Sequence, residues 1–308
     1  MLGNMMSGQL LISGLIEHAE KYHNDAEIVS RTVEGPIHRY TYGDAAKRSR
    51  QLANALEKLG LKEGDTVGTL AWNTFRHFEL YFGVSGIGCV VNTVNPRLFP
   101  EQLTYIINHA ENQYLFIDLS FVELVESLES ELKDVKGYVI LTDKGNMPET
   151  KLNNAMCYED LISVESDEFS WPEFDENTAS SLCYTSGTTG NPKGVLYSHR
   201  STILHAWIVS SGNVAKVSSS TCILPVVPMF HVNAWGIPYA GAMFGAKLVF
   251  PGPALDGASV YELIDNEKPD LLMGVPTVWL GLLQHLNETN QTLDCVETAL
   301  VGGSAAPR

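Results

Sequence analysis

The loop Tyr184-Thr185-Ser186-Gly187-Thr188-Thr189-Gly190-Asn191-Pro192-Lys193-Gly194 is the most informative stretch of this 308-residue chain. It combines three glycines, four aliphatic hydroxyls and one lysine between two β-rich runs. Glycine permits backbone dihedrals that turn successive N–H groups toward one centre, and such an arrangement binds anions. The hydroxyls add donors and the lysine adds a positive charge. The stretch therefore predicts a loop that binds the oxygens of a di- or triphosphate.

Two other nucleotide-binding motifs do not fit the chain. A Walker A loop requires lysine directly after glycine, then Ser or Thr at the start of a helix. Here an Asn-Pro dipeptide separates Gly190 from Lys193, and Gly194 follows the lysine. Segment 83–88 lacks the GxGxxG order and follows a predicted helix. We therefore interpret segment 83–88 as a tight turn from a helix into a strand.

Outside the loop, helix-like and strand-like segments alternate along the chain. The predicted strands are residues 66–70, 89–91, 114–117, 138–141, 181–184, 194–197, 222–227, 246–250 and 270–273. The predicted helices are residues 44–59, 75–84, 100–110, 122–132, 202–211 and 260–266. In the first helix, Asp44 is the predicted N-cap and Gly60 the C-terminal stop. The alternation is typical of an α/β fold with a largely parallel sheet.

Composition and charge favour a globular protein and argue against a nucleic-acid binder. The chain carries 20 Lys and Arg against 36 Asp and Glu, so its net charge is −16, and 44% of its residues are hydrophobic. This composition is typical of a globular protein. It is too acidic for a nucleic-acid binder, which needs clustered cations to neutralise phosphates. The length alone favours about two domains, and the acidic segments 143–154 and 165–177 are predicted surface loops or linkers.

The cysteines and the N-terminus bear on the compartment. Five scattered cysteines without CxxC spacing predict neither a zinc site nor a disulfide framework, and they favour a reducing, cytoplasmic location. Residues 1–16 lack the basic region of a signal peptide. No apolar run approaches the roughly 20 residues that a membrane-spanning helix needs. We therefore expect no transmembrane segment.

The glycine-rich loop resembles the signature phosphate loop of the adenylate-forming (AMP-binding) superfamily, which includes acyl-CoA synthetases, peptide-synthetase adenylation domains and luciferases. The resemblance extends to Tyr197-Ser198-His199-Arg200-Ser201, Pro228-Met229-Phe230-His231-Val232-Asn233-Ala234-Trp235-Gly236 and Gly302-Gly303-Ser304-Ala305-Ala306-Pro307. The spacing from Tyr40-Thr41-Tyr42 through Gly64-Asp65 to Asn73 is also similar. Within the superfamily, the motifs look most like those of bacterial medium- and long-chain fatty-acyl-CoA synthetases, a group that includes 3-methylthiopropionyl-CoA ligases.

The resemblance implies an α/β fold in which two stacked α/β subdomains form the large N-terminal domain. Residues 61–210 would form the first subdomain, which carries the phosphate loop. Residues 10–60 together with 211–308 would form part of the second. The family's acidic magnesium ligand, its ribose-binding aspartate and its small C-terminal lid domain are expected beyond Arg308. The chain 1–308 is therefore expected to be an incomplete AMP-binding domain.

The resemblance also implies roles for individual residues. The ATP phosphates would be bound by Thr185, Ser186, Gly187, Thr188, Thr189, Gly190 and Lys193. Thr185 would also contact Mg²⁺, with an acidic partner that the chain lacks. His231 would be the catalytic histidine on the acyl-binding and thiol-entry side, and Trp235 would gate an acyl tunnel. Gly302, Gly303 and Ser304 would line the adenine and acyl-adenylate side.

Members of this group activate a carboxylic acid with ATP to an acyl-adenylate and then transfer the acyl group to coenzyme A. The resemblance therefore implies a medium- to long-chain fatty-acyl-CoA ligase, with ATP and coenzyme A as co-substrates, Mg²⁺ as cofactor and a homodimer as a possible assembly. Three alternatives stay open. They are a 3-methylthiopropionate–CoA ligase, a nucleotide-binding but catalytically inactive fragment, and an enzyme that loads an amino acid onto a carrier protein.

Overall fold

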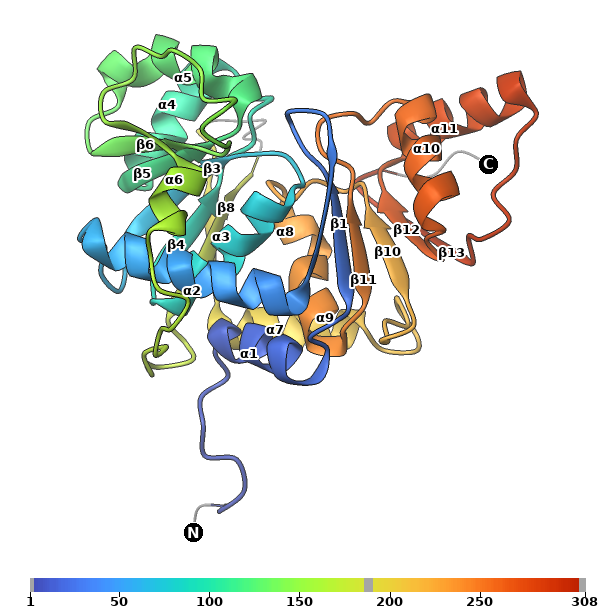
Figure 1. Cartoon of the computed structure of the whole chain (residues 1–308), viewed down its shortest axis with the longest axis horizontal. Helices are drawn as coiled ribbons and strands as arrows, with labels where there is room; N and C mark the ends of the chain where they lie inside the picture. Colours follow the sequence, from blue (N-terminus) through green and yellow to red (C-terminus); the bar gives the residue numbers. More distant parts are fainter. Residues whose placement is uncertain (1–2, 186–190, 305–308) are drawn as a thin grey trace.

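The computed structural model describes residues 3–185 and 191–304, and within them the strands form two sheets (Figure 1). Sheet A has the strand order β13 (Thr298–Val301), β12 (Leu271–Gly274), β10 (Cys222–Pro225), β11 (Lys247–Phe250), β1 (Glu27–Arg31), β2 (Ile37–Thr41). Sheet B has the order β7 (Ala155–Cys157), β6 (Gly137–Ile140), β5 (Asn112–Ile117), β3 (Thr66–Leu70), β4 (Val90–Thr93), β8 (Ala179–Tyr184), β9 (Gly194–Ser198). The β1–β2 and β8–β9 pairs are antiparallel. The other neighbours are parallel.

Helices lie between the two sheets and on their outer faces. They are α1 (Ile12–Tyr22), α2 (Tyr42–Lys58), α3 (Phe75–Gly86), α4 (Pro100–His109), α5 (Val122–Leu128), α6 (Tyr158–Ser163), α7 (His199–Val209), α8 (Val232–Trp235), α9 (Ile237–Phe244), α10 (Gly257–Glu267) and α11 (Pro276–Thr289). Short 3₁₀ turns at Leu119–Phe121 and Glu129–Glu131 flank α5.

Helix α3 explains why the two sheets are stacked. All of its residues are buried, including the charged Arg76 and Glu79, which are paired with other side chains. Phe78 and Tyr81 belong to the hydrophobic cluster that covers one face of sheet A. Leu80 and Val84 belong to the cluster that covers one face of sheet B. A single helix therefore contributes to both cores.

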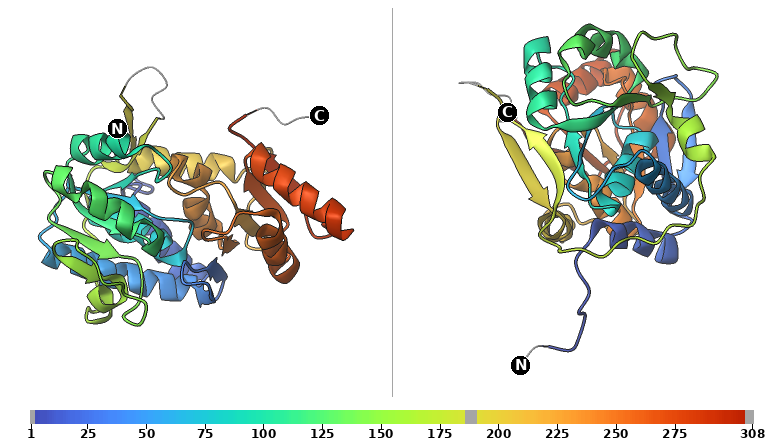
Figure 2. Two further views of the ribbon diagram at one scale, coloured as in Figure 1. Left: turned by 90° about the horizontal axis from the view of Figure 1, so that it is seen from above. Right: turned by 90° about the vertical axis from the view of Figure 1, so that its left-hand side faces the viewer.

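The outer faces of the sheets are covered by separate helices. On sheet B, Leu103 and Ile106 of α4 pack with Leu115 of β5. On sheet A, Leu263 of α10 and Leu282 of α11 pack in one cluster. Figures 1 and 2 show the resulting succession of layers, from α4 and α5 through sheet B, the central helices and sheet A to α10 and α11. The predicted stacked α/β architecture is confirmed.

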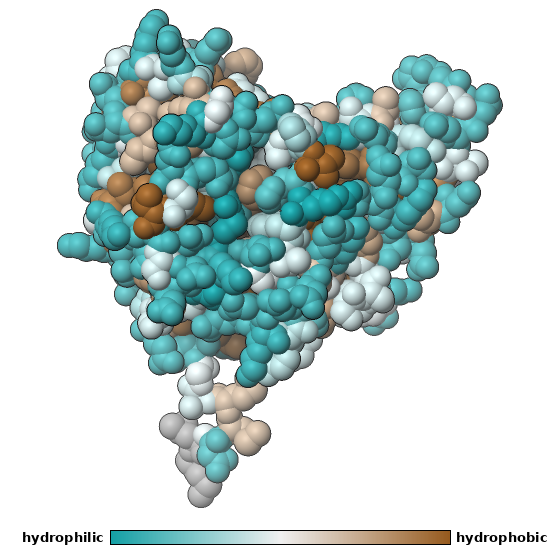
Figure 3. Space-filling view, viewed as in Figure 1, coloured by the Kyte–Doolittle hydropathy of each residue, from teal (hydrophilic) through white to brown (hydrophobic). Residues whose placement is uncertain are grey.

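One face of the molecule is largely hydrophilic (Figure 3), and the cysteines are unpaired. Hydrophilic residues cover most of the face in Figure 3. All five cysteines, which lie in the described residues, are free thiols. In residues 3–185 and 191–304, no helix is long and apolar enough to cross a membrane.

Several element boundaries differ from the predictions. Asp44 is not the N-cap of α2, so that prediction is wrong. Thr41 is the N-cap because its hydroxyl accepts the Asp44 N–H, while the Asp44 carboxylate accepts the Thr41 N–H in return. Such reciprocal capping is a capping box. The predicted helix 122–132 ends as an α-helix at Leu128.

Other elements were not predicted at all, namely α1, α6, α8, α9, α11, β1, β2 and β7. The strands of sheet B come from residues 66–198, whereas those of sheet A come from residues 27–41 and 222–301. The subdomain limits at residues 60 and 210 stay a prediction.

Candidate active site

The predicted phosphate loop connects the two strands of the β8–β9 hairpin, at the edge of sheet B. Tyr184 pairs with Gly194, and beyond them Thr185 and Lys193 close the base of the loop. The Thr185 N–H donates to the Lys193 carbonyl at 3.0 Å, and the Lys193 N–H donates to the Thr185 hydroxyl at 3.2 Å. Both residues are exposed. Five other predicted phosphate-binding residues, Ser186, Gly187, Thr188, Thr189 and Gly190, lie outside the described residues.

Thr185 is chemically suited to one position in a magnesium site. Its hydroxyl oxygen accepts one hydrogen bond, which leaves a second lone pair. Magnesium keeps several waters and uses few protein oxygens beside substrate phosphates. In the part of the chain that the structure describes, no group of three or more His, Cys, Asp or Glu could hold a metal. The Thr185 hydroxyl could therefore contribute one oxygen to a magnesium ion that a nucleotide also binds.

A second segment leaves sheet A after β10 and is held by Asn73, which lies in the segment after β3 of sheet B. The Asn73 side chain is buried and donates to the carbonyls of Pro225 and Val227 at 2.8 and 2.9 Å. It also accepts the Met229 N–H at 2.7 Å. The Tyr81 hydroxyl donates to the Met229 carbonyl at 2.6 Å. Backbone groups that leave a sheet need such partners when they are buried.

The segment then forms a left-handed turn, α8. Val232, Asn233, Ala234 and Trp235 have φ between 48° and 54°, and Gly236 follows at 78°. For L-residues this conformation costs roughly 1–2 kcal/mol each. It is most unusual for a β-branched residue such as Val232. A turn of this kind persists only where surrounding contacts hold it.

Asn233 makes the contacts that hold the turn. Its side-chain oxygen accepts from the Cys183 thiol at 2.9 Å. Its side-chain nitrogen donates to the hydroxyls of Ser181 at 3.0 Å and Tyr239 at 3.3 Å. Burial raises the pKa values of Cys183 and Tyr239, so both groups keep their protons at neutral pH. Since Cys183 and Ser181 belong to β8, the turn is attached to the strand that leads into the phosphate loop.

Trp235 and Gly302, which the sequence assigned to different roles, lie against each other. A Cβ atom on Gly302 would come within 2.7 Å of the Trp235 ring, so only glycine allows this approach. The Gly302 N–H donates to the Gly274 carbonyl at 3.3 Å and prolongs the β12–β13 pairing. Gly303 has a φ of 85°. Ser304 is exposed.

His231 lies immediately before the turn and is exposed. Its N–H donates to the Pro228 carbonyl at 3.1 Å, and its carbonyl accepts from Ala234 at 3.2 Å. By contrast, His199 of the preceding motif is buried, and its ring accepts the Ile12 N–H at 3.1 Å. Burial lowers the pKa of His199 to about 4. Of these two histidines, only His231 is exposed.

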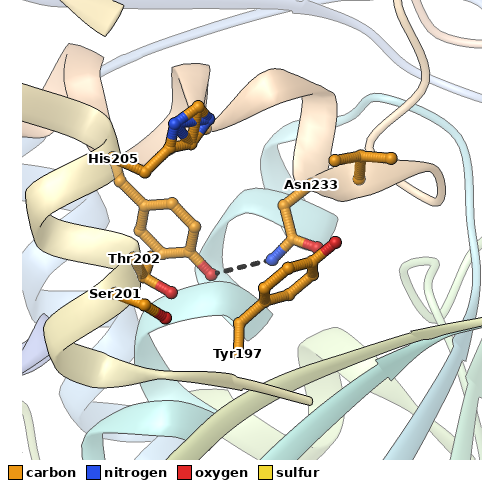
Figure 4. Close-up of a pocket in the computed structure, with 8 residues that line it drawn as sticks. Tyr197, Ser201, Thr202, His205 and Asn233 are labelled. Carbon is orange, nitrogen blue, oxygen red and sulfur yellow. Dashed lines mark hydrogen bonds between the residues drawn. The ribbon is translucent and has the colours of Figure 1, made fainter. Parts of the chain in front are cut away.

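A cavity of about 370 Å³ lies beside the turn (Figure 4). Its lining residues are Tyr197, Ser201, Thr202, His205, Val232, Asn233, Gly236 and Tyr239. Two of the motifs quoted from the sequence, around residues 197–201 and 228–236, therefore border one cavity. The left-handed turn separates this cavity from Gly302.

The sequence analysis identified part of this arrangement. The motifs quoted from the sequence contain five of the eight lining residues, Tyr197, Ser201, Val232, Asn233 and Gly236, but no role was predicted for Asn233. Asn73 entered only through its spacing. His205 and Tyr239 carried no sequence signal, because their positions depend on how α7 and α9 pack. The structure brings Trp235 to Gly302, and through Asn233 it brings the turn to β8.

The sequence as a whole matches the family model described as AMP-binding enzyme over residues 15–308. The chain therefore belongs to the AMP-binding enzyme family.

Curated relatives narrow the comparison to CoA ligases. The 3-methylmercaptopropionyl-CoA ligase of Ruegeria lacuscaerulensis is 50% identical over 307 residues, which are 100% of this chain and 57% of that protein. The medium-chain-fatty-acid–CoA ligase of Ectopseudomonas oleovorans is 49% identical, over 100% of this chain and 56% of that protein. The chain thus spans a little more than half the length of these relatives.

Solved structures agree on the fold. An anthranilate CoA ligase, AuaEII, in complex with anthranoyl-AMP superposes with a TM-score of 0.85 and 22% identity, over 96% of this chain and 56% of that chain. The N-terminal domain of FACL13 from Mycobacterium tuberculosis superposes with a TM-score of 0.81 and 21% identity, over 96% of this chain and 71% of that chain. At these identities the likeness concerns the fold alone.

Proposed function

We propose that this chain is the acid- and nucleotide-binding part of an acyl-CoA ligase that activates a medium- to long-chain fatty acid with ATP and transfers the acyl group to coenzyme A. The observation that carries the proposal is the cavity beside the turn that holds Trp235 against Gly302. Relatives named as CoA ligases, at 49–50% identity, support the class of reaction. The activity is proposed for a protein that adds counterparts of the rest of those relatives. The 308-residue chain alone is expected to be catalytically inactive.

In this proposal, the two sheets supply different groups to one reaction. The loop from Thr185 to Lys193 binds the ATP phosphates, with Lys193 countering their charge. Gly302, Gly303 and Ser304 lie on the adenine and acyl-adenylate side. His231 stands on the thiol-entry side, and the Trp235 ring separates the acyl cavity from the adenylate. The chain thereby positions the carboxylate against the α-phosphate and offsets the charge that develops there.

Magnesium is the proposed cofactor, and Thr185 is the residue of this chain that would contact it. When bound with ATP, a magnesium ion neutralises phosphate charge and so favours departure of pyrophosphate. The Thr185 hydroxyl would contribute one oxygen to the site. Its bond from the Lys193 N–H holds that oxygen at the base of the loop.

A shorter acid, 3-methylthiopropionate, is the second candidate substrate. The relative named for this acid is 50% identical to the chain and the medium-chain relative 49%, so identity does not separate them. The cavity of about 370 Å³ is near the lower end of the range for small-molecule pockets, about 300–1,000 Å³. The cavity size therefore does not separate the two candidate acids either.

A chimera tests the proposal directly. Residues 1–308 are joined to the remaining part of the Ruegeria lacuscaerulensis ligase, and thioester formation is measured with 3-methylthiopropionate, decanoate, palmitate and a set of amino acids. We expect a CoA thioester from at least one of the three carboxylic acids. We expect no acid-dependent ATP–pyrophosphate exchange from residues 1–308 alone. A cooperatively folded chimera that forms no acyl-CoA, or that accepts only amino acids, would overturn the proposal.

Location and assembly form part of the same proposal. We propose a cytoplasmic enzyme, on the basis of its five free thiols. Its partners would be the acid, ATP and coenzyme A. The net charge of −16 disfavours nucleic acid as a partner. A homodimer is carried over from the family resemblance.

A further inference from the structure

Most residues of the left-handed turn are not of a type that favours this backbone conformation. Only Gly236, at its end, is free of the Cβ that opposes this conformation. The side chains of Val232 and Ala234 offer no hydrogen bonds. Asn233 is the residue of the turn with a buried polar side chain, and its exposed fraction is 5%. Apolar packing of Ala234 and Trp235 contributes to the turn, and its side-chain hydrogen bonds come from Asn233.

The Asn233 amide is fully engaged. A primary amide has two N–H donors, and here both are used, one by Ser181 and one by Tyr239. Its oxygen accepts from Cys183, which also contacts the Thr93 hydroxyl of β4 at 3.2 Å. The amide is thus bonded to the interior of sheet B on one side and to α9 on the other. The dashed line in Figure 4 marks the hydrogen bond that the Asn233 amide donates to the Tyr239 hydroxyl.

Asn233 belongs to the part of the turn that lies between the cavity and Gly302. Its own side chain lines the cavity, as do Val232 and Gly236. Trp235, two residues further, contacts Gly302 on the other side. A change in the backbone dihedrals of residue 233 would therefore move the indole ring relative to both.

We propose that Asn233 is a positioning residue for Trp235: its three hydrogen bonds to Ser181, Cys183 and Tyr239 hold the left-handed turn, and the turn holds the indole ring between the acyl cavity and Gly302. The importance of this role for acyl binding rests on the function proposed above. The geometric part of the role does not. Asn233 acts through the backbone of its own turn, and Cys183 and Ser181 extend its reach to the strand that enters the phosphate loop.

The test uses the 308-residue chain labelled with 5-fluorotryptophan. The chain has five tryptophans, and the ¹⁹F resonance of Trp235 is assigned with Trp235→Phe. Asn233→Gly is the decisive variant, since glycine accepts a left-handed backbone but removes all three hydrogen bonds. We expect its Trp235 resonance to shift or split. If Asn233→Gly keeps the resonance of the unchanged chain, the turn is held by backbone alone and the proposal is wrong.

Substitutions of the hydrogen-bond partners of Asn233 extend the test. They keep it decisive if the Asn233 variant does not fold. Cys183→Ser keeps a donor toward Asn233, so the Trp235 resonance should stay in place. Ser181→Ala removes an acceptor and should shift it. The matched control is Asn112→Ala, because Asn112 is a fully buried asparagine in β5 that bonds the Ile107 carbonyl. A shift in the Asn112 variant as large as that of Asn233→Gly would show a general loss of packing and would overturn the proposal.

Decanoate binding, measured by calorimetry, separates this inference from the proposed function. We expect Asn233→Gly to weaken decanoate binding about tenfold, the equivalent of about one hydrogen bond. Unchanged affinity in that variant would overturn the link between Asn233 and acyl binding. If the unchanged chain binds no decanoate, the proposed function of the cavity fails, while the fluorine spectra still decide whether Asn233 positions Trp235.

Discussion

Sheets A and B are joined by two kinds of polar contact, and the two differ in what they hold. Near the middle layer, a charged cluster consists of Arg48, Arg76, Glu34, Glu79 and Glu159. At the carboxyl edges of the strands, the polar contacts are made by two side-chain amides, those of Asn73 and Asn233. The cluster joins side chain to side chain, whereas Asn73 binds backbone groups and Asn233 fixes a backbone conformation.

The charged cluster is built from short, mostly buried contacts. Arg48 binds Glu79 at 2.7 Å and Glu159 at 3.0 Å, and Arg76 binds Glu159 and Glu34 at 2.8 Å each. The Glu79 carboxyl is fully buried, and burial raises its pKa although Arg48 lies beside it. Glu34 comes from the segment between β1 and β2 of sheet A, so the cluster bridges the two halves.

The two kinds of contact are expected to have different effects, one on the stability of the fold and the other on the shape of the candidate site. An ion pair in the middle layer keeps the layers together but tolerates small shifts of the backbone. An amide that bonds several fixed groups restricts the segment that it joins; Asn73 does this through backbone groups and Asn233 through side chains. We therefore expect the cluster to govern the free energy of unfolding, and the amides to govern the segment that carries His231 and Trp235.

The largest expected effect comes from Glu79→Ala. Removing one partner leaves Arg48 as a partly unpaired buried charge, which should lower the free energy of unfolding by about 3–5 kcal/mol. Urea denaturation followed by circular dichroism measures the change. The ¹⁹F resonance of Trp235 in the folded variant should stay in place.

An exposed ion pair provides the control for this variant. Lys268 and Asp265 are 61% and 56% exposed, so Asp265→Ala should change stability by less than about 1 kcal/mol. A loss in Glu79→Ala as small as that of the control would break the comparison, since the cluster would then contribute little to stability.

Asp118 is a buried carboxyl whose contribution to stability depends on whether it is charged or neutral. Asp118 is 1% exposed and accepts the Trp72 N–H at 2.6 Å. Burial raises its pKa to about 7, against the opposing effects of that N–H and of Arg76. In the unfolded chain the carboxyl loses its proton near its ordinary pKa of about 3.9.

The pKa shift gives a defined sign to the pH dependence. Between about pH 4 and pH 7 the native state binds more protons at Asp118 than the unfolded state, so this group makes stability fall as pH rises through that window. Asp118→Asn removes the titration. We expect nearly equal stability of variant and unchanged chain at pH 4, and a gain on the order of 4 kcal/mol for the variant at pH 8. Parallel pH profiles from urea denaturation would contradict the assignment.

The sequence predicted those elements whose signals are local. Strand β3 has the predicted bounds of 66–70, because an apolar run follows directly on a Gly-Asp turn. Helix α4 starts at Pro100 as predicted, since proline is favoured in the first turn. Helix α1 also carried a local signal that was overlooked, with Ile12, Ile16 and Ala19 on one buried face.

The arrangement around the turn could not be predicted from local signals. The left-handed conformation at Asn233 depends on Ser181, 52 positions earlier in the chain. The bonds of Asn73 reach residues 152 to 156 positions away. The apolar, Gly- and Pro-containing run through α9 shows no clear helical period, because α9 is buried on most sides. Motif resemblance located the segment, but its backbone was settled by packing.

Among the three main variants, Asn73→Ala is expected to change stability least. It is also the most direct test of the difference between the charged cluster and the amides. It leaves the carbonyls of Pro225 and Val227 and the N–H of Met229 without their side-chain partner, which should cost about 1–3 kcal/mol. The matched control Asn112→Ala should cost a similar amount. Amide hydrogen exchange distinguishes the two variants, because local opening exposes only the amides of the affected segment.

We expect faster exchange at residues 226–231 in Asn73→Ala and unchanged exchange there in Asn112→Ala. Since the Met229 N–H bonds directly to Asn73, its protection should fall most. Equal protection of Met229 in the two variants would mean that the segment is held by β10 and α9 alone. In that case the amides would resemble the charged cluster in contributing stability without fixing the backbone, and the distinction between the two kinds of contact would be lost.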